Sequence, residues 1–476
     1  MADSIKTKAA SGMVWAIGER LLTQGTLFLV SIVLARLLTP NEYGILAILL
    51  VFTNLADVLV TNGMGEALVQ KQNVEDIDYS TVFLSAMTLA LFLYGLIFFS
   101  ANLIASFYGN SDLEIYLQVL AIRIPLSALN AVQKAYISKN FLFQKQFFAS
   151  FVGSFVSGIV AIILAWLGFG VYALIAQQLL SLLLISGLLA LITKWVPHLG
   201  FNPHSFKSLV PLGLQFCGAS LVNSIYTEGR SLLIGKFYSS ADLAYFNRGN
   251  QFPALVVDNL NAPMSSVILP VLAEIKTNGR EIKFAVRKAA QISSFIVFPL
   301  MGMLFVSASN LVSFLLGAKW LESVPYLQIA CVFYLFQPLQ TINWQVLKSL
   351  GEGQLCIKLE ILKKVLCFAM LLFAVPNGVI AISIASALAG FLSCCINMVP
   401  NRSLIGYGLF QQIVDVFKPL FATVVASAIA SLFLHLHVAP LLGLLMQLLV
   451  GLAIYLIICR FIKCEGFELI RAELSK

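Results

Sequence analysis

Charged and polar residues recur at helical spacing inside stretches that are otherwise apolar. Arg123 is followed at i+4, i+7 and i+11 by Ser127, Asn130 and Lys134, so on a helix these side chains share one face. An arginine inside a membrane-spanning helix is costly and usually faces water or a partner. Its planar guanidinium suits phosphate and carboxylate oxygens. The pattern therefore predicts a hydrated cationic surface that binds an anion, or an arginine that pairs with an acid.

Three further segments carry comparable stripes. They comprise Arg20, Gln24 and Ser31; Ser220, Asn223, Thr227 and Arg230; and Gln337, Thr341, Gln345 and Lys348. For the uncharged members, the alternative is that they hydrogen-bond neighbouring helices. The expected substrate-binding residues are Arg20, Arg123, Arg230 and Arg248, with Gln24, Ser127, Asn130, Asn223, Thr227, Gln337 and Thr341 lining the same polar cavity.

Acidic residues lie in or beside the same stretches. Asp57, Glu228 and Asp258 are candidates for binding a proton or a sodium ion, because acids inside spans often belong to ion pathways. The alternative is that these acids, together with Glu19, pair one for one with the four arginines. Glu228 and Arg230 lie about 200° apart on an ideal helix, so they are poorly placed to pair with each other.

The sequence lacks the motifs of the common enzyme and metal sites. It has no GxxxxGK[ST] nucleotide-binding motif, no serine–histidine–aspartate constellation and no cysteine or histidine spacing typical of zinc. We therefore expect no enzymatic activity, no cofactor and no metal. The net charge of +8 is scattered through short loops instead of gathered on one face, which argues against a nucleic-acid partner.

The elements that must position these residues are membrane helices. Of 476 residues, 59% are hydrophobic and 11% are charged, which is far from the composition of soluble domains. Apolar runs of about 20 residues predict an all-α protein with about fourteen transmembrane helices. They fall at roughly 12–37, 43–62, 79–106, 114–138, 145–167, 171–193, 207–236, 243–268, 286–316, 323–348, 357–375, 378–399, 413–435 and 440–462.

Lysine and arginine are distributed unevenly between the ends of these spans. One set of ends carries 23 of the 30 basic residues, and the opposite set carries only Arg36, Lys236 and Lys319. Because basic loops remain in the cytoplasm, both termini and the loop at 276–288 are predicted to be cytoplasmic.

The chain contains an internal repeat. The segment SIVLARLLTPNEYGILA at 31–47 aligns with SLLIGKFYSSADLAYFN at 231–247, and Asn130 later aligns with Asn343. Six spans per repeat is an even number, so both copies should enter the membrane from the same face, as parallel bundles. The predicted organisation is a six-helix bundle at 1–194, a cytoplasmic linker at 195–206, a second bundle at 207–400, and an appended helix pair with a cytoplasmic tail at 401–476.

Three segments resemble a known family. They are ARLLTPNEYGILA at 35–47, GMGEALVQKQNVEDIDYSTVF at 63–83 and IGKFYSSADLAYFNRGNQFP at 234–253. They are similar to corner and loop signatures of the polysaccharide-transporter (Wzx-like) branch of the multidrug/oligosaccharidyl-lipid/polysaccharide (MOP) flippase superfamily. The closest resemblance is to exporters of colanic acid, O-antigen and teichuronic acid repeat units.

This resemblance implies a V-shaped pair of six-helix bundles in the bacterial inner membrane. It implies that a polyprenyl-diphosphate-linked oligosaccharide is flipped to the outer leaflet by alternating access, for exopolysaccharide, capsule or O-antigen assembly. Cavity arginines bind the diphosphate in this family, a role that Arg20 and Arg248 match best. The implied partners are this substrate, membrane lipids, and the polysaccharide polymerase and glycosyltransferases of the pathway.

Two alternatives from other classes stay open. A cation-coupled multidrug exporter shares the repeat, but it would favour an acidic cavity. A polytopic glycosyltransferase or polymerase would need catalytic loops outside the membrane, and the predicted external segments are short.

Overall fold

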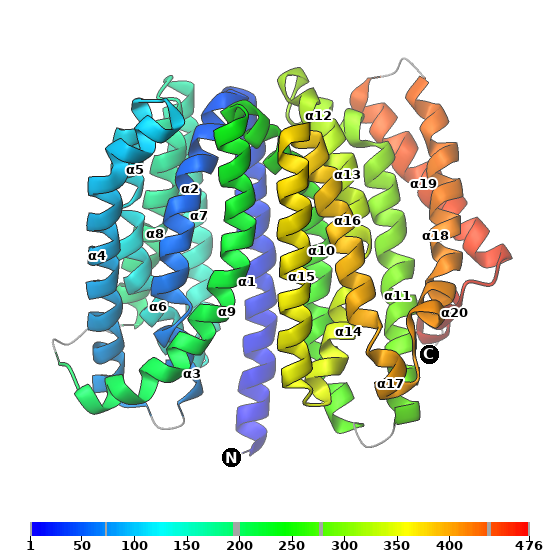
Figure 1. The fold of residues 1–476 in the computed structure, drawn as a ribbon, viewed down its shortest axis with the longest axis horizontal. Coiled ribbons are helices and arrows are strands. Elements are labelled where there is room, and N and C mark those ends of the chain that lie inside the picture. Colours follow the sequence, from blue (N-terminus) through cyan, green and yellow to red (C-terminus); the bar gives the residue numbers. More distant parts are fainter. Residues whose placement is uncertain (1, 72–73, 194–199, 276–278, 436–438, 475–476) are drawn as a thin grey trace. The chain divides into compact units, whose positions relative to one another are not determined.

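The structure, a computed structural model, describes residues 2–71, 74–193, 200–275, 279–435 and 439–474. Within these ranges every regular element is a helix, which confirms the expected all-helical polytopic fold (Figure 1). The chain divides into two compact units, Met1–Ala244 and Tyr245–Lys476. Residues 195–199 of the expected linker lie outside the described residues, and the expected domain boundaries stay a prediction.

The first unit is a bundle of long helices with short connections. Its helices are α1 (Ala2–Leu37), α2 (Pro40–Thr61), α3 (Met64–Gln70), α4 (Asp76–Tyr108), α5 (Asp112–Leu120), α6 (Arg123–Lys139), α7 (Phe143–Trp166), α8 (Val171–Thr193) and α9 (Pro203–Phe237). Small residues on α7 let its neighbours approach closely: a Cβ added at Gly158 would lie 2.5 Å from Val30 of α1, and one at Gly153 would lie 2.6 Å from Ile185 of α8. Close packing through small residues is the usual way in which membrane helices associate.

The second unit has the same character. It begins within α10 (Ser240–Glu274) and continues with α11 (Gly279–Val306), α12 (Ala308–Leu315), η1 (Ala318–Ser323), α13 (Val324–Leu335), α14 (Gln337–Ser349), α15 (Gly353–Ala374), η2 (Val375–Asn377), α16 (Val379–Met398), α17 (Asn401–Ile405), α18 (Leu409–Ser431), η3 (Leu432–His435), α19 (Pro440–Phe461) and α20 (Glu465–Leu474).

Ten helical segments in the described part of the chain are long and apolar enough to cross a membrane. Six lie in the first unit and four in the second. The other four expected spans are helical as well, as α9, α10, α13 with α14, and α15, but they are more polar or are broken. Helix α15 carries four charged residues, Lys358, Glu360, Lys363 and Lys364.

The two aligned corners have the same hydrogen-bonded structure. Before α2, the Thr39 amide donates to Glu42 Oε2 (2.6 Å), and the Glu42 amide donates to Thr39 Oγ1 (3.4 Å). Before α10, the Ser239 amide donates to Asp242 Oδ2 (3.1 Å), and the Asp242 amide donates to Ser239 Oγ (3.0 Å). Each corner is thus a reciprocal capping box that satisfies the exposed amides at a helix start. The sequence repeat is therefore also a repeat of local structure.

The two corners also contact each other within the first unit. The Ser240 hydroxyl is hydrogen-bonded to Asn41 Oδ1. A Cβ added at Gly44 would lie 1.7 Å from the backbone oxygen of Ser240. The backbone at the start of α10 therefore occupies the space that any larger residue at position 44 would need.

A proline breaks the equivalent helix in both units. The ring of Pro125 removes a backbone donor and crowds the carbonyl of Ala121, and the helix breaks there into α5 and α6. Pro338 does the same to the helix that divides into α13 and α14. The two prolines are separated by the same 213 residues that separate Asn130 from Asn343.

Candidate functional site

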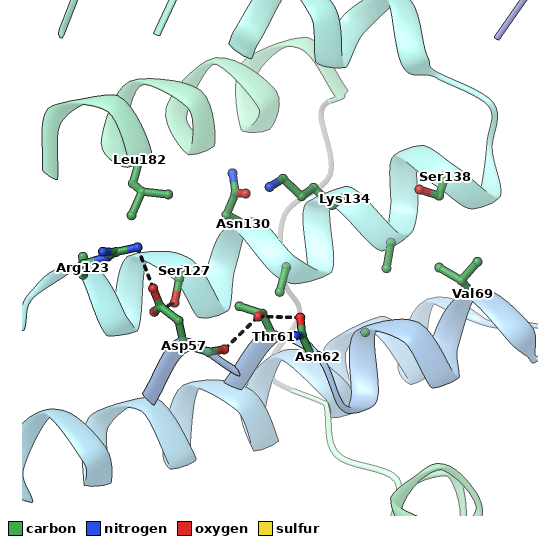
Figure 2. Close-up of a pocket in the computed structure, with 13 residues that line it drawn as sticks. Asp57, Thr61, Asn62, Val69, Arg123, Ser127, Asn130, Lys134, Ser138 and Leu182 are labelled. Atoms are coloured by element: carbon green, nitrogen blue, oxygen red, sulfur yellow. Dashed lines mark hydrogen bonds and ion pairs between the residues drawn. The ribbon is translucent and has the colours of Figure 1, made fainter. Parts of the chain in front are cut away.

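A polar cavity of about 410 Å³ opens inside the first unit, between α2, α3, α6 and α8 (Figure 2). Its walls hold charged, hydroxyl and amide side chains together with a few small or apolar ones. The lining residues are Asp57, Thr61, Asn62, Gly65, Val69, Arg123, Ser127, Asn130, Ala131, Lys134, Ala135, Ser138 and Leu182. The structure thus places the whole predicted polar face of α6 on one wall.

An ion pair lies at one end of this cavity. Arg123 Nη2 is 2.8 Å from Asp57 Oδ2, and both side chains are largely buried. The Ser127 hydroxyl donates to Asp57 Oδ1 at 2.8 Å. Arg123 Nη1 also donates to Asn54 Oδ1 at 3.4 Å. A buried charge is tolerated when it is paired and its remaining donors and acceptors are used. These contacts use both terminal nitrogens of Arg123 and both oxygens of Asp57, whereas Arg123 Nε is buried without a hydrogen-bond partner in the described part of the chain.

The ion pair is connected to a third helix. Asn54 Nδ2 donates to Glu228 Oε1 at 3.1 Å. A continuous polar path therefore runs from Glu228 on α9 through Asn54 on α2 to Arg123 on α6 and on to Asp57. Two of the three acids expected to bind an ion belong to this one path.

The other end of the cavity is lined by amides and a lysine. Asn130 Nδ2 donates to Ser186 Oγ on α8 (3.3 Å), and in Figure 2 Asn130 and Lys134 point toward the same space beside Leu182. Glu19 of α1 attracts Lys134 electrostatically. The lining as a whole carries two cations and one acid. Such a cavity can hold an anion between Arg123 and Lys134 while the hydroxyls and amides bond its polar groups.

The remaining predicted residues of the first unit lie outside the lining of this cavity. Arg20 and Gln24 are half-buried on α1. On α9, Asn223 and Thr227 are exposed, and the Thr227 hydroxyl donates to the backbone oxygen of Asn223 (3.1 Å). Arg230 is half-buried and attracts Glu228 electrostatically.

In the second unit, Arg248 is buried against an aromatic ring. Only 7% of it is exposed, its Nη1 donates to Gln251 Oε1 (2.5 Å), and its guanidinium carbon is 5.5 Å from the ring centroid of Trp320. Asp258, further along α10, is exposed. Gln337 accepts a hydrogen bond from Asn261 Nδ2 at 3.1 Å. The Thr341 hydroxyl donates to the backbone oxygen of Gln337 at 3.0 Å.

The amide that aligns with Asn130 has different surroundings. Asn343 Nδ2 donates to Gln412 Oε1 (2.8 Å), and Gln412 Nε2 donates back to Asn343 Oδ1 (2.9 Å). Asn401 Nδ2 also donates to Asn343 Oδ1. The second unit therefore uses this position to fasten α14 to α17 and α18, whereas in the first unit Asn130 lines a cavity.

Sequence reasoning missed several residues of the site. Thr53, Asn54, Thr61 and Asn62 all bond to or line the cavity around Asp57. A signal was present, because Asn54, Asp57 and Thr61 fall at i, i+3 and i+7 and share a helix face. Leu182 and Ser186 of α8 had no such signal, since they lie in an apolar helix.

Residues 33–325 match the family model described as "Polysaccharide biosynthesis protein". The chain belongs to this family of polysaccharide biosynthesis proteins. It is 23% identical to the succinoglycan biosynthesis transport protein ExoT of Rhizobium meliloti (strain 1021), over 95% of this chain and 92% of ExoT. It is 20% identical to the lipopolysaccharide biosynthesis protein WzxC of Escherichia coli (strain K12), over 88% of this chain and 86% of WzxC.

Solved structures share the fold of this polysaccharide biosynthesis protein. The lipid II flippase MurJ in an inward closed conformation superposes with a TM-score of 0.77 at 16% identity, over 95% of this chain and 98% of MurJ. An inward-facing multidrug resistance MATE family transporter of the MOP superfamily gives a TM-score of 0.63 at 16% identity, over 82% and 98%. The chain is thus a multi-pass membrane protein of the polysaccharide biosynthesis family, with a MOP-type fold.

Proposed function

We propose that the chain flips a polyprenyl-diphosphate-linked oligosaccharide repeat unit from the cytoplasmic to the outer leaflet of the bacterial inner membrane. The observation that carries the proposal is Arg123, held with Asp57 in a polar cavity among membrane helices. A diphosphate offers several oxygens to a guanidinium fork, and the hydroxyls and amides around it suit sugar hydroxyls. Family membership supports a polysaccharide precursor as the cargo.

The proposed membrane arrangement has fourteen spans and two parallel six-helix bundles, at 1–194 and 207–400. An appended helix pair follows at 401–476, and both termini are cytoplasmic. Alternating access of the two bundles moves the substrate. Arg20, Arg248 and Arg230 are proposed as further anion-binding residues, on the strength of the sequence pattern and the family resemblance.

The ion pair suggests how substrate binding is linked to the protonation of Asp57. Arg123 Nη2 cannot contact Asp57 and a substrate phosphate in the same way at once, so the two anions compete for it. A proton that neutralises Asp57 releases Arg123 for the substrate, and loss of that proton restores the pair and favours release. Glu228 is connected to Arg123 by hydrogen bonds through Asn54. We propose Asp258 as a third candidate for ion binding.

Export of polymer from cells lacking their own repeat-unit exporter tests the proposal. Alanine at Arg20 or Arg248 should abolish export and lysine should impair it, while alanine at Arg123 or Arg230 should weaken it. Losing one charge-assisted contact costs ~1.5–3 kcal/mol, or roughly ten- to hundredfold in binding. Alanine at Arg36, an exposed residue at the corner before α2, is the matched control and should be tolerated.

Membrane abundance must be measured in parallel, because removing Arg123 alone leaves Asp57 buried without its partner. The double variant Arg123→Gln with Asp57→Asn removes both charges and should restore abundance without restoring export. Normal export from the Arg123 alanine variant would overturn the role of the Arg123–Asp57 cavity, and normal export from the Arg20 and Arg248 alanine variants would remove these two arginines from the proposed substrate site. Efflux of cationic dyes by the wild-type protein would instead favour a multidrug exporter of the same fold.

A further inference from the structure

A second charged cavity lies in the second unit, and none of the residues proposed to bind the exported substrate lines it. It has a volume of about 590 Å³ and is formed by α11, α18 and the connection between α19 and α20. Four cationic side chains, Arg287, Lys288, Lys418 and Lys463, and two acidic ones line it. The lining therefore has an excess of positive charge.

The acids near this cavity are already engaged. Asp415 accepts two hydrogen bonds from Arg287, from Nε at 2.9 Å and from Nη2 at 2.6 Å. It also accepts the Tyr407 hydroxyl at 2.7 Å. Burial, and then this hydrogen bond, raise the pKa of the Tyr407 hydroxyl, so the hydroxyl keeps the proton that it donates. Asp415 is thus a fixed support for Arg287.

Glu465 is held in a similar way. It accepts hydrogen bonds from Gln291 Nε2 and from Arg287 Nη2, the latter at 3.4 Å. The remaining acid of the lining is Glu468, while Lys288, Lys418 and Lys463 face the same space. Lys418 Nζ donates to the backbone oxygen of Lys463 at 3.2 Å, which fixes its amine at the cavity wall.

The element that closes the cavity is firmly docked. A Cβ added at Gly466 would lie 2.7 Å from the backbone oxygen of Gln291, so α20 lies directly against α11. Phe467 and Ile470 of α20 pack into an apolar cluster with Phe295 and Tyr455. The cations are therefore held on a preformed wall instead of on a loose tail.

Exposed aromatic side chains lie in the lining of the cavity or close in sequence to its cations. Phe284 of the lining is 69% exposed, and Phe417 and Phe461, next to Lys418 and near Lys463, are 58% and 82% exposed. Lys288 and Lys418 lie in the first half of the candidate spans Gly279–Val306 and Leu409–Ser431, and the candidate span Pro440–Phe461 ends just before Lys463. Cations next to exposed aromatic rings at the end of a span are suited to the boundary between lipid chains and headgroups, where basic pockets bind anionic headgroups.

We propose that this cavity binds the phosphate of an anionic membrane lipid, with Arg287, Lys288, Lys418 and Lys463 as the cationic contacts. A bound headgroup would join α11, α18 and α20 at the membrane surface. The lipid is preferred over a free phosphate because the flanking aromatic rings give its acyl chains a surface to follow.

Titration of phosphatidylglycerol into the purified full-length protein in neutral detergent, followed by native mass spectrometry, tests this proposal. Each of Lys288→Gln and Lys418→Gln should weaken binding about fivefold, and the double variant about thirtyfold. Lys418→Arg should keep binding. The matched control is Lys358→Gln, which removes the same charge from an exposed position of α15 in the same unit, and it should bind as the wild type does.

Two further measurements distinguish binding of an anionic lipid from binding of a neutral lipid or of free inorganic phosphate. Phosphatidylcholine, which carries a phosphate but no net charge, should bind far more weakly. Inorganic phosphate at the same concentration should fail to displace the lipid. Equal losses in Lys358→Gln and in the double variant would overturn the proposal, and so would displacement by inorganic phosphate. Polymer export is not needed for any of these measurements, so they stand apart from the test of flipping.

Discussion

At the scale of single residues, the first unit pairs an arginine with an acid for which the sequence left two roles open, ion binding and pairing with an arginine. Arg123 was predicted from its stripe to meet an anionic substrate, and Asp57 was predicted to bind a proton or a sodium ion. In the structure the two side chains are 2.8 Å apart and share one cavity. The residue proposed to bind the substrate and the residue proposed to bind the ion are therefore in direct contact.

Replacing Asp57 by Asn tests this exchange. The amide imitates a permanently neutral acid, so Arg123 should always be available and binding of polyprenyl diphosphate should no longer depend on pH. In the wild type, binding should strengthen as the pH falls, because protonation removes the competing anion. The measurement is binding to the detergent-purified protein over a range of pH.

Export assays of the amide substitutions at Glu228 and Asp258, together with Asp57→Asn, test whether any of the three acids couples export to an ion. If the Asp57→Asn, Glu228→Gln and Asp258→Asn variants all export polymer at the normal rate with the wild-type pH dependence, coupling through these acids is wrong. A changed pH dependence confined to Asp258→Asn would move the coupling site to the second unit.

At the scale of the elements, one close backbone approach fixes how α2 meets the start of α10. Gly44→Ala should destabilise the protein, since the new methyl group would collide with the Ser240 backbone, and overpacking of this kind typically costs ~1–3 kcal/mol. The expected result is a lower temperature of half-unfolding, measured by size-exclusion chromatography after heating in detergent.

Gly95→Ala is the matched control within the same unit. It lies in α4, and no atom lies within 4 Å of its added Cβ. Alanine there should be neutral or slightly stabilising, because alanine exceeds glycine in helix propensity by about 1 kcal/mol. If both variants unfold at the same temperature as the wild type, the corner contact is not tight in the folded protein.

Helices, corners and repeat could be read from the sequence because each depends on local chemistry. A capping box, for example, needs only Thr39 and Glu42. The partner of Arg123 could not be read in this way, since it depends on how α2 and α6 are rotated about their axes. The same limit hid the difference between Asn130 and Asn343, which share a repeat position but face different neighbours.

At the scale of the whole molecule, the distribution of basic residues predicts which ends of the helices face the cytoplasm. In the second unit, Lys288 at the end of the predicted cytoplasmic loop lines one cavity together with Lys418 and Lys463. Residues 276–278 of the expected loop lie outside the described residues, but Glu281 is described and exposed.

Labelling of single cysteines in a cysteine-free background checks the topology. A cysteine at position 281 should react with a membrane-impermeant thiol reagent only after the cells are opened, and one at position 319 should react in intact cells. Both native side chains are exposed, so access through the fold is not limiting. Reaction of position 281 from outside would reverse the proposed orientation and place both termini outside.

The corner contact also bears on the history of the gene. A newly duplicated gene encodes two identical corners, yet this contact treats them differently: position 44 has no room for a methyl group, whereas its aligned partner Ala244 carries one in a buried position. A duplicated chain with glycine in both copies could form the contact as it stands, whereas one with alanine in both would carry the cost of overpacking at position 44. The contact therefore constrains one corner of the repeat and leaves the residue at the aligned position of the other able to change.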